Sequence, residues 1–137
     1  MGMISVTDVN AFLADAYPSA AESGVRCEAL DDGTATARWA FDEAVLRPGR
    51  YISGPTIFTI SDSALWFACF TVIGIEAMAV MSEMSLRFLR PARDGDLLAT
   101  ATIVSVGRRR FVGNVEVWVD GARDRLVAVA QGAYAVP

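Results

Sequence analysis

The chain has 137 residues, the length of one ordinary domain, and can bury most of the apolar surface that its unfolded form exposes. Its net charge of −4 is small, and its basic residues form no dense patch with interleaved aromatic residues, so nothing indicates a nucleic-acid partner. All 12 basic residues are arginines and histidine is absent, which excludes Schiff-base lysines, histidine-dependent hydrolysis and histidine-ligated metal sites. Proton transfer near neutral pH must therefore use a carboxylate, a thiol, a tyrosine or water.

The composition also bears on assembly and location. The hydrophobic content of 53% and the mean hydropathy of +0.37 exceed the average for globular domains, so we expect an oligomer in which subunit contacts hide apolar surface. The two cysteines, Cys27 and Cys69, lie far apart in the sequence and are expected to be small core residues. The first residues contain acids and lack the pattern of a secretory signal, so a cytoplasmic location is expected.

The first elements are a helix and a hairpin. Thr7 is a suitable N-cap for a helix over residues 8–16, which would belong to a flanking segment over residues 1–20 and end before Pro18. Residues 24–41 alternate apolar and polar side chains on both sides of Asp32-Gly33, and this pattern predicts two strands joined by a tight turn.

The next element is a long apolar helix over residues 55–73. Gly54 and Pro55 suit its start and Gly74 suits its end. The helix is long enough to span a bilayer, but Asp62 in its middle and several interspersed serines and threonines argue against a membrane segment. A bare carboxylate in an apolar setting is costly unless it is paired or its pKa shifts, so Asp62 is a candidate functional residue.

The rest of the chain reads as strands, over residues 77–89, 97–107, 110–120 and 125–136. The whole chain, residues 1–137, is therefore expected to be one α+β domain in which an antiparallel sheet wraps around one long central helix. A helix that is apolar on nearly all faces must be covered on all faces, and one sheet covers only one side. We expect a second subunit on the other side.

Three motifs in this order resemble the hotdog-fold acyl-CoA thioesterases of the phenylacetate-pathway (PaaI-like) family. The first is SGPTIFTISDSA, residues 53–64, in which Ser53, Gly54 and Pro55 stand at the family's His-Gly-Gly and Asp62 stands at its catalytic acid. The second is MSLRFLRPARDGDLLATATIVSVGRR, residues 84–109, and the third is VAVAQGAYAV, residues 127–136. The resemblance implies a hotdog fold assembled as a dimer or a dimer of dimers, and thioester hydrolysis.

The resemblance also implies roles for individual residues. Asp62 would be the general base or nucleophile, and the Gly54 N–H at the helix start would polarise the thioester oxygen. Ser82 would present a hydroxyl to the attacking water, with Ser85 as the alternative. Two positions differ from the family pattern besides Pro55, because Ser53 replaces its histidine and Arg47 replaces an asparagine that helps to polarise the carbonyl.

The substrate would be an acyl-CoA or aryl-CoA, with coenzyme A as part of the substrate and no further cofactor or metal. Because arginines bind phosphate through bidentate charge-assisted bonds, the nucleotide end would meet arginines at turns. Those arginines are Arg90, Arg108 and Arg109. Arg47, Ser53 and Pro55, around the start of the long helix, would also contact the substrate. Trp66 would help to line the acyl pocket. Three alternatives stay open: a carrier-protein thioester as substrate, a dimer or a tetramer, and a catalytically silent protein that binds or senses acyl-CoA. A hydratase of the same fold is disfavoured because that branch relies on histidine.

Overall fold

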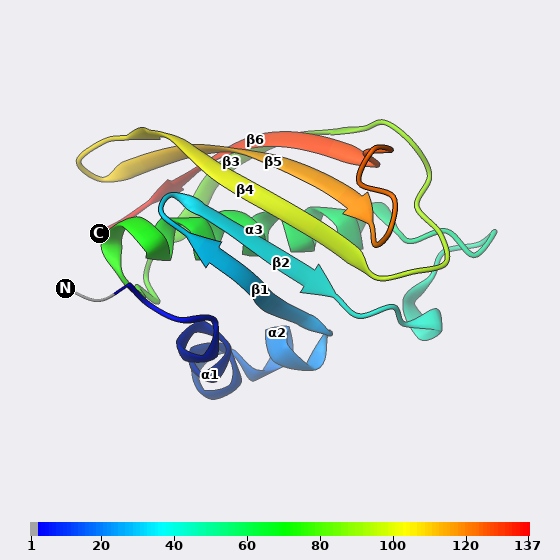
Figure 1. Cartoon of the computed structure of the whole chain (residues 1–137), viewed down its shortest axis with the longest axis horizontal. Helices are drawn as coiled ribbons and strands as arrows, with labels where there is room; N and C mark the ends of the chain where they lie inside the picture. Colours follow the sequence, from blue (N-terminus) through cyan, green and yellow to red (C-terminus); the bar gives the residue numbers. More distant parts are fainter. Residues whose placement is uncertain (1–2) are drawn as a thin grey trace.

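The computed structural model describes residues 3–137. They form three α-helices, a short 3-10 helix and a six-stranded antiparallel sheet of strand order β1-β2-β4-β5-β6-β3 (Figure 1). The helices are α1 (Val6–Ala16), α2 (Pro18–Glu22), η1 (Glu43–Val45) and α3 (Gly54–Ile73). The strands are β1 (Val25–Asp31), β2 (Thr34–Trp39), β3 (Val80–Phe88), β4 (Leu97–Val106), β5 (Arg110–Val119) and β6 (Ala128–Ala135). This is the hotdog arrangement that the sequence predicts.

Local sequence signals set the two ends of α3. Ser53 is the N-cap, and its hydroxyl accepts a hydrogen bond from the Thr56 N–H at 3.2 Å. Pro55 lies in the first turn, where its missing N–H costs nothing. The helix ends at Gly74, whose φ of 85° belongs to the region that favours glycine. The predicted start and end of this helix are confirmed.

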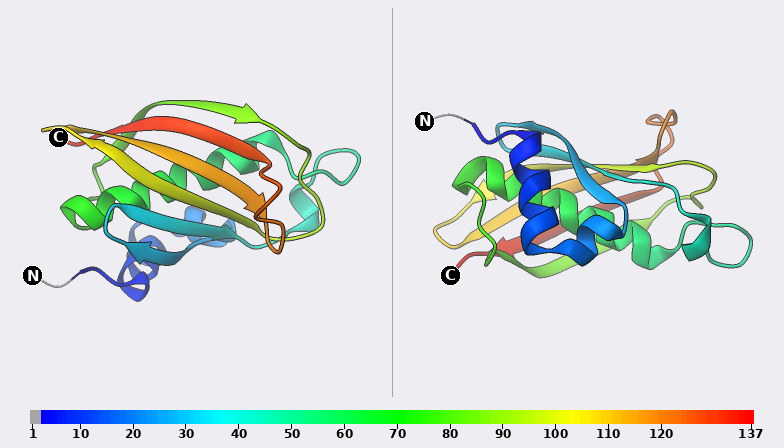
Figure 2. Two further views of the ribbon diagram at one scale, coloured as in Figure 1. Left: turned by 45° about the horizontal axis from the view of Figure 1, so that its top comes forward. Right: turned by 90° about the horizontal axis from the view of Figure 1, so that it is seen from below.

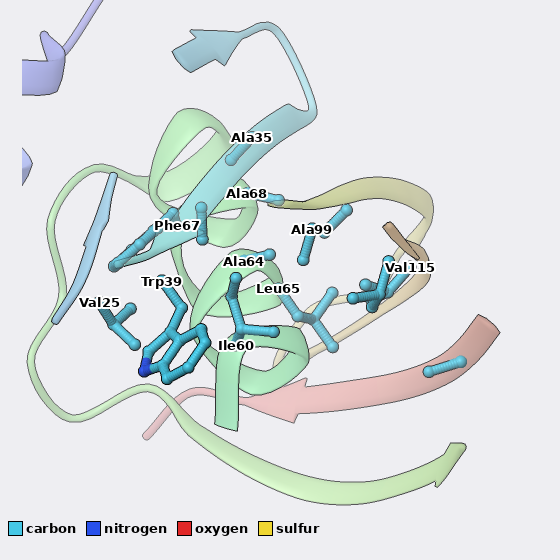
Figure 3. Packing of buried hydrophobic residues seen from close by; sticks show 14 of the residues in the cluster. Val25, Ala35, Trp39, Ile60, Ala64, Leu65, Phe67, Ala68, Ala99 and Val115 are labelled. Carbon is cyan, nitrogen blue, oxygen red and sulfur yellow. The ribbon is translucent and has the colours of Figure 1, made fainter. Parts of the chain in front are cut away.

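Two glycines on the inner face of the sheet allow it to lie close against α3. Gly113 on β5 pairs with Gly132 on β6, and both lie against Leu65 of the helix. A Cβ at Gly113 would meet Leu65 Cδ1 at 2.5 Å, and a Cβ at Gly132 would meet Leu65 Cδ2 at 3.0 Å. The backbone of the sheet therefore approaches the helix as closely as packing allows. Figure 3 shows the helix residues Ile60, Ala64, Leu65 and Ala68 facing the buried side chains of the sheet.

The start of the chain corrects the predicted helix boundary. Helix α1 begins at Val6, and its N-cap is Ser5 rather than Thr7. The Ser5 hydroxyl accepts from the Asp8 N–H at 3.0 Å, and the Asp8 carboxylate accepts from the Ser5 N–H at 3.1 Å. This reciprocal capping box satisfies two backbone donors, which a cap at Thr7 would leave free. The second helix, α2, was not predicted, and Pro18 occupies its first turn.

The two N-terminal helices cover part of α3 that the sheet leaves open. Seen from below, α1 lies across α3 and α2 lies beside it (Figure 2, right). The ring of Phe12 on α1 meets the ring of Phe70 on α3 edge-on at 5.7 Å between centroids. Asn10 holds α1 to the edge strand β1, since its amide donates to the Cys27 carbonyl at 3.0 Å and accepts from the Cys27 N–H at 2.8 Å. The cover expected from a second subunit is thus supplied partly by this chain.

By length and composition α3 is long and apolar enough to span a membrane. It is also the core helix of this fold, and half of its most apolar stretch is buried inside the molecule. Core helices of folded domains meet the same criteria, so this composition does not indicate a membrane span. Towards its N-terminal end α3 still exposes Pro55, Phe58 and Thr59.

Candidate active site

Asp62 lies in the middle of α3 and is partly buried on the side that faces β6. One of its carboxylate oxygens, Oδ1, accepts a short hydrogen bond from the hydroxyl of Tyr134 on β6. The same hydroxyl lies 3.3 Å from the Asp62 carbonyl oxygen. Tyr134 is itself buried, at 4% exposure, so the pair is held by packing on both sides. The lone carboxylate of the helix therefore has one defined partner.

Burial and the tyrosine act on Asp62 in opposite directions. Loss of solvent raises the pKa of Asp62 above its ordinary value, and the hydrogen bond from Tyr134 offsets part of that rise. Burial, followed by the charge of Asp62, raises the pKa of Tyr134 far above its usual range, so Tyr134 stays a protonated donor. A raised pKa makes the ionised carboxylate a stronger proton acceptor, which suits a general base.

Asp62 lines a cavity of about 410 Å³, which we call the Asp62 cavity. The α3 side of this cavity consists of Thr59, Ser63 and Trp66, together with Asp62 itself. The sheet side includes Val25 of β1, Val80 and Met81 of β3, and Tyr134 of β6. Trp66, predicted to line an acyl pocket, thus lies beside the carboxylate. Its indole Nε1 is buried and has no hydrogen-bond partner among residues 3–137.

Tyr134 is the site residue that the sequence reading missed. It belongs to the strand motif VAVAQGAYAV, where Ala128, Ala130 and Gly132 alternate with it and face inward. A tyrosine at an inward position of an otherwise small and apolar strand needs a partner for its hydroxyl. That requirement was a usable signal, although it does not say which partner the hydroxyl meets. Thr59 also lines the cavity, but it makes no hydrogen bond to Asp62.

Gly54 lies at the N-terminal end of α3. As the first residue of the helix it presents an N–H that has no acceptor within the helix. It lines a second cavity of about 590 Å³, the Gly54 cavity, which also includes Arg47, Arg90 and Phe88. Arg90 donates from Nη1 to the Leu126 carbonyl at 2.9 Å. The helix start and two of the predicted substrate-binding arginines therefore share one cavity.

Gly54 and Asp62 are separated along one helix. Eight residues at 1.5 Å per residue place them about 12 Å apart along the axis of α3. The reacting carbon and oxygen of a thioester lie side by side, so one thioester cannot contact both groups of the same chain. The structure therefore does not bring these two predicted catalytic groups together within one subunit.

Arg108 and Arg109 lie at the end of the molecule opposite to Gly54. They follow β4 in the β4–β5 hairpin, beyond the pair formed by Val106 and Phe111. The β4–β5 hairpin and the β1–β2 turn lie at the same end of the sheet, beside the C-terminal end of α3 (Figure 1). There the Gly33 N–H of the β1–β2 turn donates to the Thr71 hydroxyl at 2.8 Å. Within one chain these two arginines cannot share a ligand site with Arg90.

The remaining predicted residues have clear positions. Ser82 lies at an irregularity of β3, between Met81 and Glu83, and its hydroxyl donates to the Ala133 carbonyl at 3.3 Å. Ser82 does not line the Asp62 cavity, whereas its neighbour Met81 does. Ser85, the alternative, lies in a polar groove with Arg87, Asn114 and Gln131. Ser53 and Pro55 flank Gly54 at the start of α3, where Ser53 acts as the helix cap.

The residues described by the structure contain no cluster of three or more histidine, cysteine, aspartate or glutamate side chains suited to hold a metal ion. The groups that line the two cavities include a carboxylate, a tyrosine hydroxyl, a helix N-terminus and arginines.

Comparison with known proteins identifies relatives over most of the chain. The model of the thioesterase superfamily matches residues 49–125, a range that contains both Gly54 and Asp62. A protein of Saccharolobus solfataricus named as a candidate esterase is 28% identical over 134 residues, covering 98% of this chain and 87% of its own.

Solved structures agree with this result. The structure of a candidate thioesterase from Silicibacter sp. TM1040 has a TM-score of 0.88 at 29% identity and covers 100% of this chain and 95% of its own. The PaaI protein from the phenylacetic acid degradation operon of E. coli has a TM-score of 0.79 at 25% identity and covers 97% of this chain and 96% of its own.

Proposed function

This chain belongs to the thioesterase superfamily, and on that premise we propose that it hydrolyses acyl-CoA thioesters, with Asp62 as the catalytic carboxylate. The observation that carries the proposal is Asp62 itself, which has a raised pKa and lines a cavity beside Trp66. Its hydrogen bond from Tyr134 fixes the carboxylate while leaving it ionisable. The protein is expected to act in the cytoplasm as a homodimer or homotetramer.

The reaction needs one base and one oxyanion site. In the general-base route Asp62 takes a proton from water, the water oxygen bonds to the thioester carbon, and the carbonyl oxygen becomes an oxyanion. The C–S bond then breaks and the sulfur takes the proton, which yields free acid and coenzyme A. In the nucleophilic route the Asp62 carboxylate attacks the thioester carbon, and the C–S bond breaks to release the coenzyme A thiolate. Water then hydrolyses the mixed anhydride to the free acid and the Asp62 carboxylate, and the thiolate takes up one of the protons released. In both routes the Gly54 N–H at the positive end of α3 stabilises the oxyanion.

The separation of about 12 Å between Gly54 and Asp62 requires a second copy of the chain. The exposed α3 residues between them, including Phe58 and Thr59, provide a surface on which the second copy can pack. In such a dimer Gly54 of one chain faces Asp62 of the other. Arg47 and Arg90 lie near Gly54 and would bind the phosphates of coenzyme A. Arg108 and Arg109 could contact the same ligand only if they came from a different copy of the chain than Arg90.

The proposal is tested by incubating purified protein with short, medium, long and aromatic acyl-CoAs and with an acyl carrier-protein thioester. A chromogenic thiol reagent reports release of the free thiol. Cys27 and Cys69 do not interfere, because both are buried and burial raises the pKa of each to about 12. Turnover of acyl-CoAs supports the proposal. Turnover of the carrier-protein thioester alone would change the substrate class.

A second function is favoured by the positions at which this chain departs from its family, Ser53 and Arg47. A protein that lost the polarising side chains would bind acyl-CoA without hydrolysing it. Tight binding of acyl-CoA by calorimetry together with no thiol release over hours would establish this sensing function and overturn the enzymatic one.

Tyr134→Phe is expected to move the acidic limb of the pH profile of kcat/KM to higher pH. The base must be ionised, so activity falls as pH drops through the pKa of Asp62, which is raised above 3.8 in the folded protein. The Tyr134 hydroxyl lowers that pKa, and its loss raises the pKa further. Profiles of the wild type and the variant with one acyl-CoA measure the shift. An unmoved limb in a folded variant would show that Tyr134 does not tune the base.

A further inference from the structure

The two N-terminal helices form one wall of the Asp62 cavity. Leu13 of α1, Tyr17 at the junction, and Ser19, Ala20 and Ser23 of the α2 region all line it. We propose that Tyr17 limits the size of the acyl group that can lie beside Asp62, and that the cavity selects neutral acyl groups. This inference rests on the thioesterase function proposed above and concerns its specificity.

Backbone hydrogen bonds on both sides of Tyr17 fix the position of its Cα. It ends α1 and caps α2, so its N–H donates to the Leu13 carbonyl at 2.9 Å while its carbonyl accepts from the Ala20 N–H at 3.0 Å. Moving its Cα would therefore break the end of one helix and the start of another. Pro18, the next residue, further restricts the chain at this corner.

The side chain of Tyr17 stands between the cavity and solvent. Its ring meets the ring of Trp66 edge-on at 6.4 Å between centroids, and half of the residue is exposed. An acyl group that extends from Asp62 along Trp66 meets the Tyr17 ring on the way out. Edge-to-face contacts of this kind stabilise the position of both rings. Tyr17 therefore acts as a fixed barrier rather than a freely rotating surface residue.

The wall itself is anchored to the sheet. Leu13, one turn before Tyr17, is 2% exposed. Asn10 makes two hydrogen bonds to Cys27, at 3.0 Å and 2.8 Å, and so pairs the backbone carbonyl and N–H of Cys27 on the edge strand β1. These contacts hold α1 against β1, and the ring of Phe12, which lies 5.6 Å from the ring of Trp66 between centroids, holds α1 against α3.

The lining determines the charge of the acyl group. Asp62 is the one charged side chain among the cavity residues, and no arginine is among them in the described part of the chain. The other lining groups are apolar or carry hydroxyls, as Ser19 and Ser63 do. A carboxylate at the far end of an acyl group would lose water without gaining a cation and would be repelled by Asp62. Neutral acyl groups avoid both costs.

The volume determines the size. A cavity of roughly 150 Å³ holds one benzene ring in an apolar protein core. The Asp62 cavity, at about 410 Å³, has room for a ring or a medium acyl chain in addition to the reacting carbonyl. Longer chains must displace the Tyr17 ring. Removing that ring opens the cavity to solvent without touching Asp62 or Tyr134.

The test compares kcat/KM for dodecanoyl-CoA and hexanoyl-CoA in purified full-length variants. In Tyr17→Ala we expect the dodecanoyl-to-hexanoyl ratio to rise at least about tenfold, since one methylene in a closed pocket changes specificity by that order. Tyr17→Phe keeps the ring and should keep the ratio, and Tyr17→Trp should lower it. Asp15→Ala, on the exposed side of α1, is the control for a change in the same helix. Glutaryl-CoA should be hydrolysed at least about tenfold less efficiently than pentanoyl-CoA by the wild type.

The outcomes separate the two proposals. A wild type that hydrolyses no acyl-CoA overturns the acyl-CoA thioesterase function proposed above. A wild type that is active, with the same chain-length ratio in Tyr17→Ala and Tyr17→Trp, overturns the role of Tyr17 and leaves the function intact. If Tyr17→Ala melts below the assay temperature, Tyr17→Trp alone decides the size limit. Equal turnover of glutaryl-CoA and pentanoyl-CoA would overturn the selection for neutral acyl groups.

Discussion

Asp62→Asn is expected to lower kcat/KM for acyl-CoA hydrolysis by about 100- to 10,000-fold, the range that a positioned general base contributes. The amide keeps the shape of the side chain, and its oxygen can still accept the hydrogen bond from Tyr134. It can neither take a proton from water nor attack the thioester carbon. Thiol release at saturating and subsaturating acyl-CoA, for the wild type and the variant, measures the loss.

The same substitution should not destabilise the fold at neutral pH. The pKa of Asp62 is raised in the folded state above its ordinary 3.8, so the stability that it contributes is present below pH 3.8 and is lost as pH rises through the folded value. Above pH 3.8 the burial of this acid therefore opposes folding, and a neutral asparagine removes that cost. We expect a melting temperature equal to or above that of the wild type, as is common for residues kept for function.

Asp15→Asn provides the matched control, because it removes one carboxylate from an exposed position of α1 and leaves the site unchanged. Its kcat/KM should match that of the wild type. Full activity in a folded Asp62→Asn variant would show that another group activates water. A large fall in the melting temperature would instead show that Asp62 is a structural residue whose charge stabilises the fold.

Gly54→Pro is expected to lower kcat/KM by roughly 100- to 1,000-fold, the usual effect of deleting one oxyanion donor. Proline removes the N–H of the first helical residue, which has no acceptor within α3, and it adds a ring beside Phe88. The KM for acyl-CoA should change less than kcat, because the N–H acts on charge that develops in the transition state.

Gly54→Ala distinguishes loss of the N–H donor from the effect of a larger side chain at this position. The alanine keeps the donor and places a Cβ 3.2 Å from Cζ of Phe88, at the outer end of a side chain that can shift slightly. Its activity should therefore lie much closer to the wild type than that of Gly54→Pro. Equal losses in the two variants would mean that space at Gly54 matters and that its N–H does not stabilise the oxyanion.

Several features of the protein follow from the sequence alone, because they depend on neighbours in the chain. Ser53, Pro55 and Gly74 predict the cap, the start and the end of α3, because their conformational preferences depend only on neighbouring residues. The alternation in the strands and the turn at Asp32-Gly33 predict the sheet in the same way. Asp62 was recognisable as a functional candidate, because a carboxylate in an apolar helix is costly wherever the helix lies. The boundary of α1 was missed by two residues because two capping residues compete there.

Only the tertiary structure shows what surrounds Asp62. Its partner Tyr134 lies on the last strand, and the sequence pattern states that this tyrosine faces inward without stating which group it meets. The N-terminal helices reach the Asp62 cavity because Asn10 bonds to the edge of β1, a contact that no local preference encodes. The antiparallel arrangement of the sheet also places Arg90 and Arg108 at opposite ends of α3. Periodicity fixes which face a residue occupies, whereas the packing of distant segments decides which faces meet.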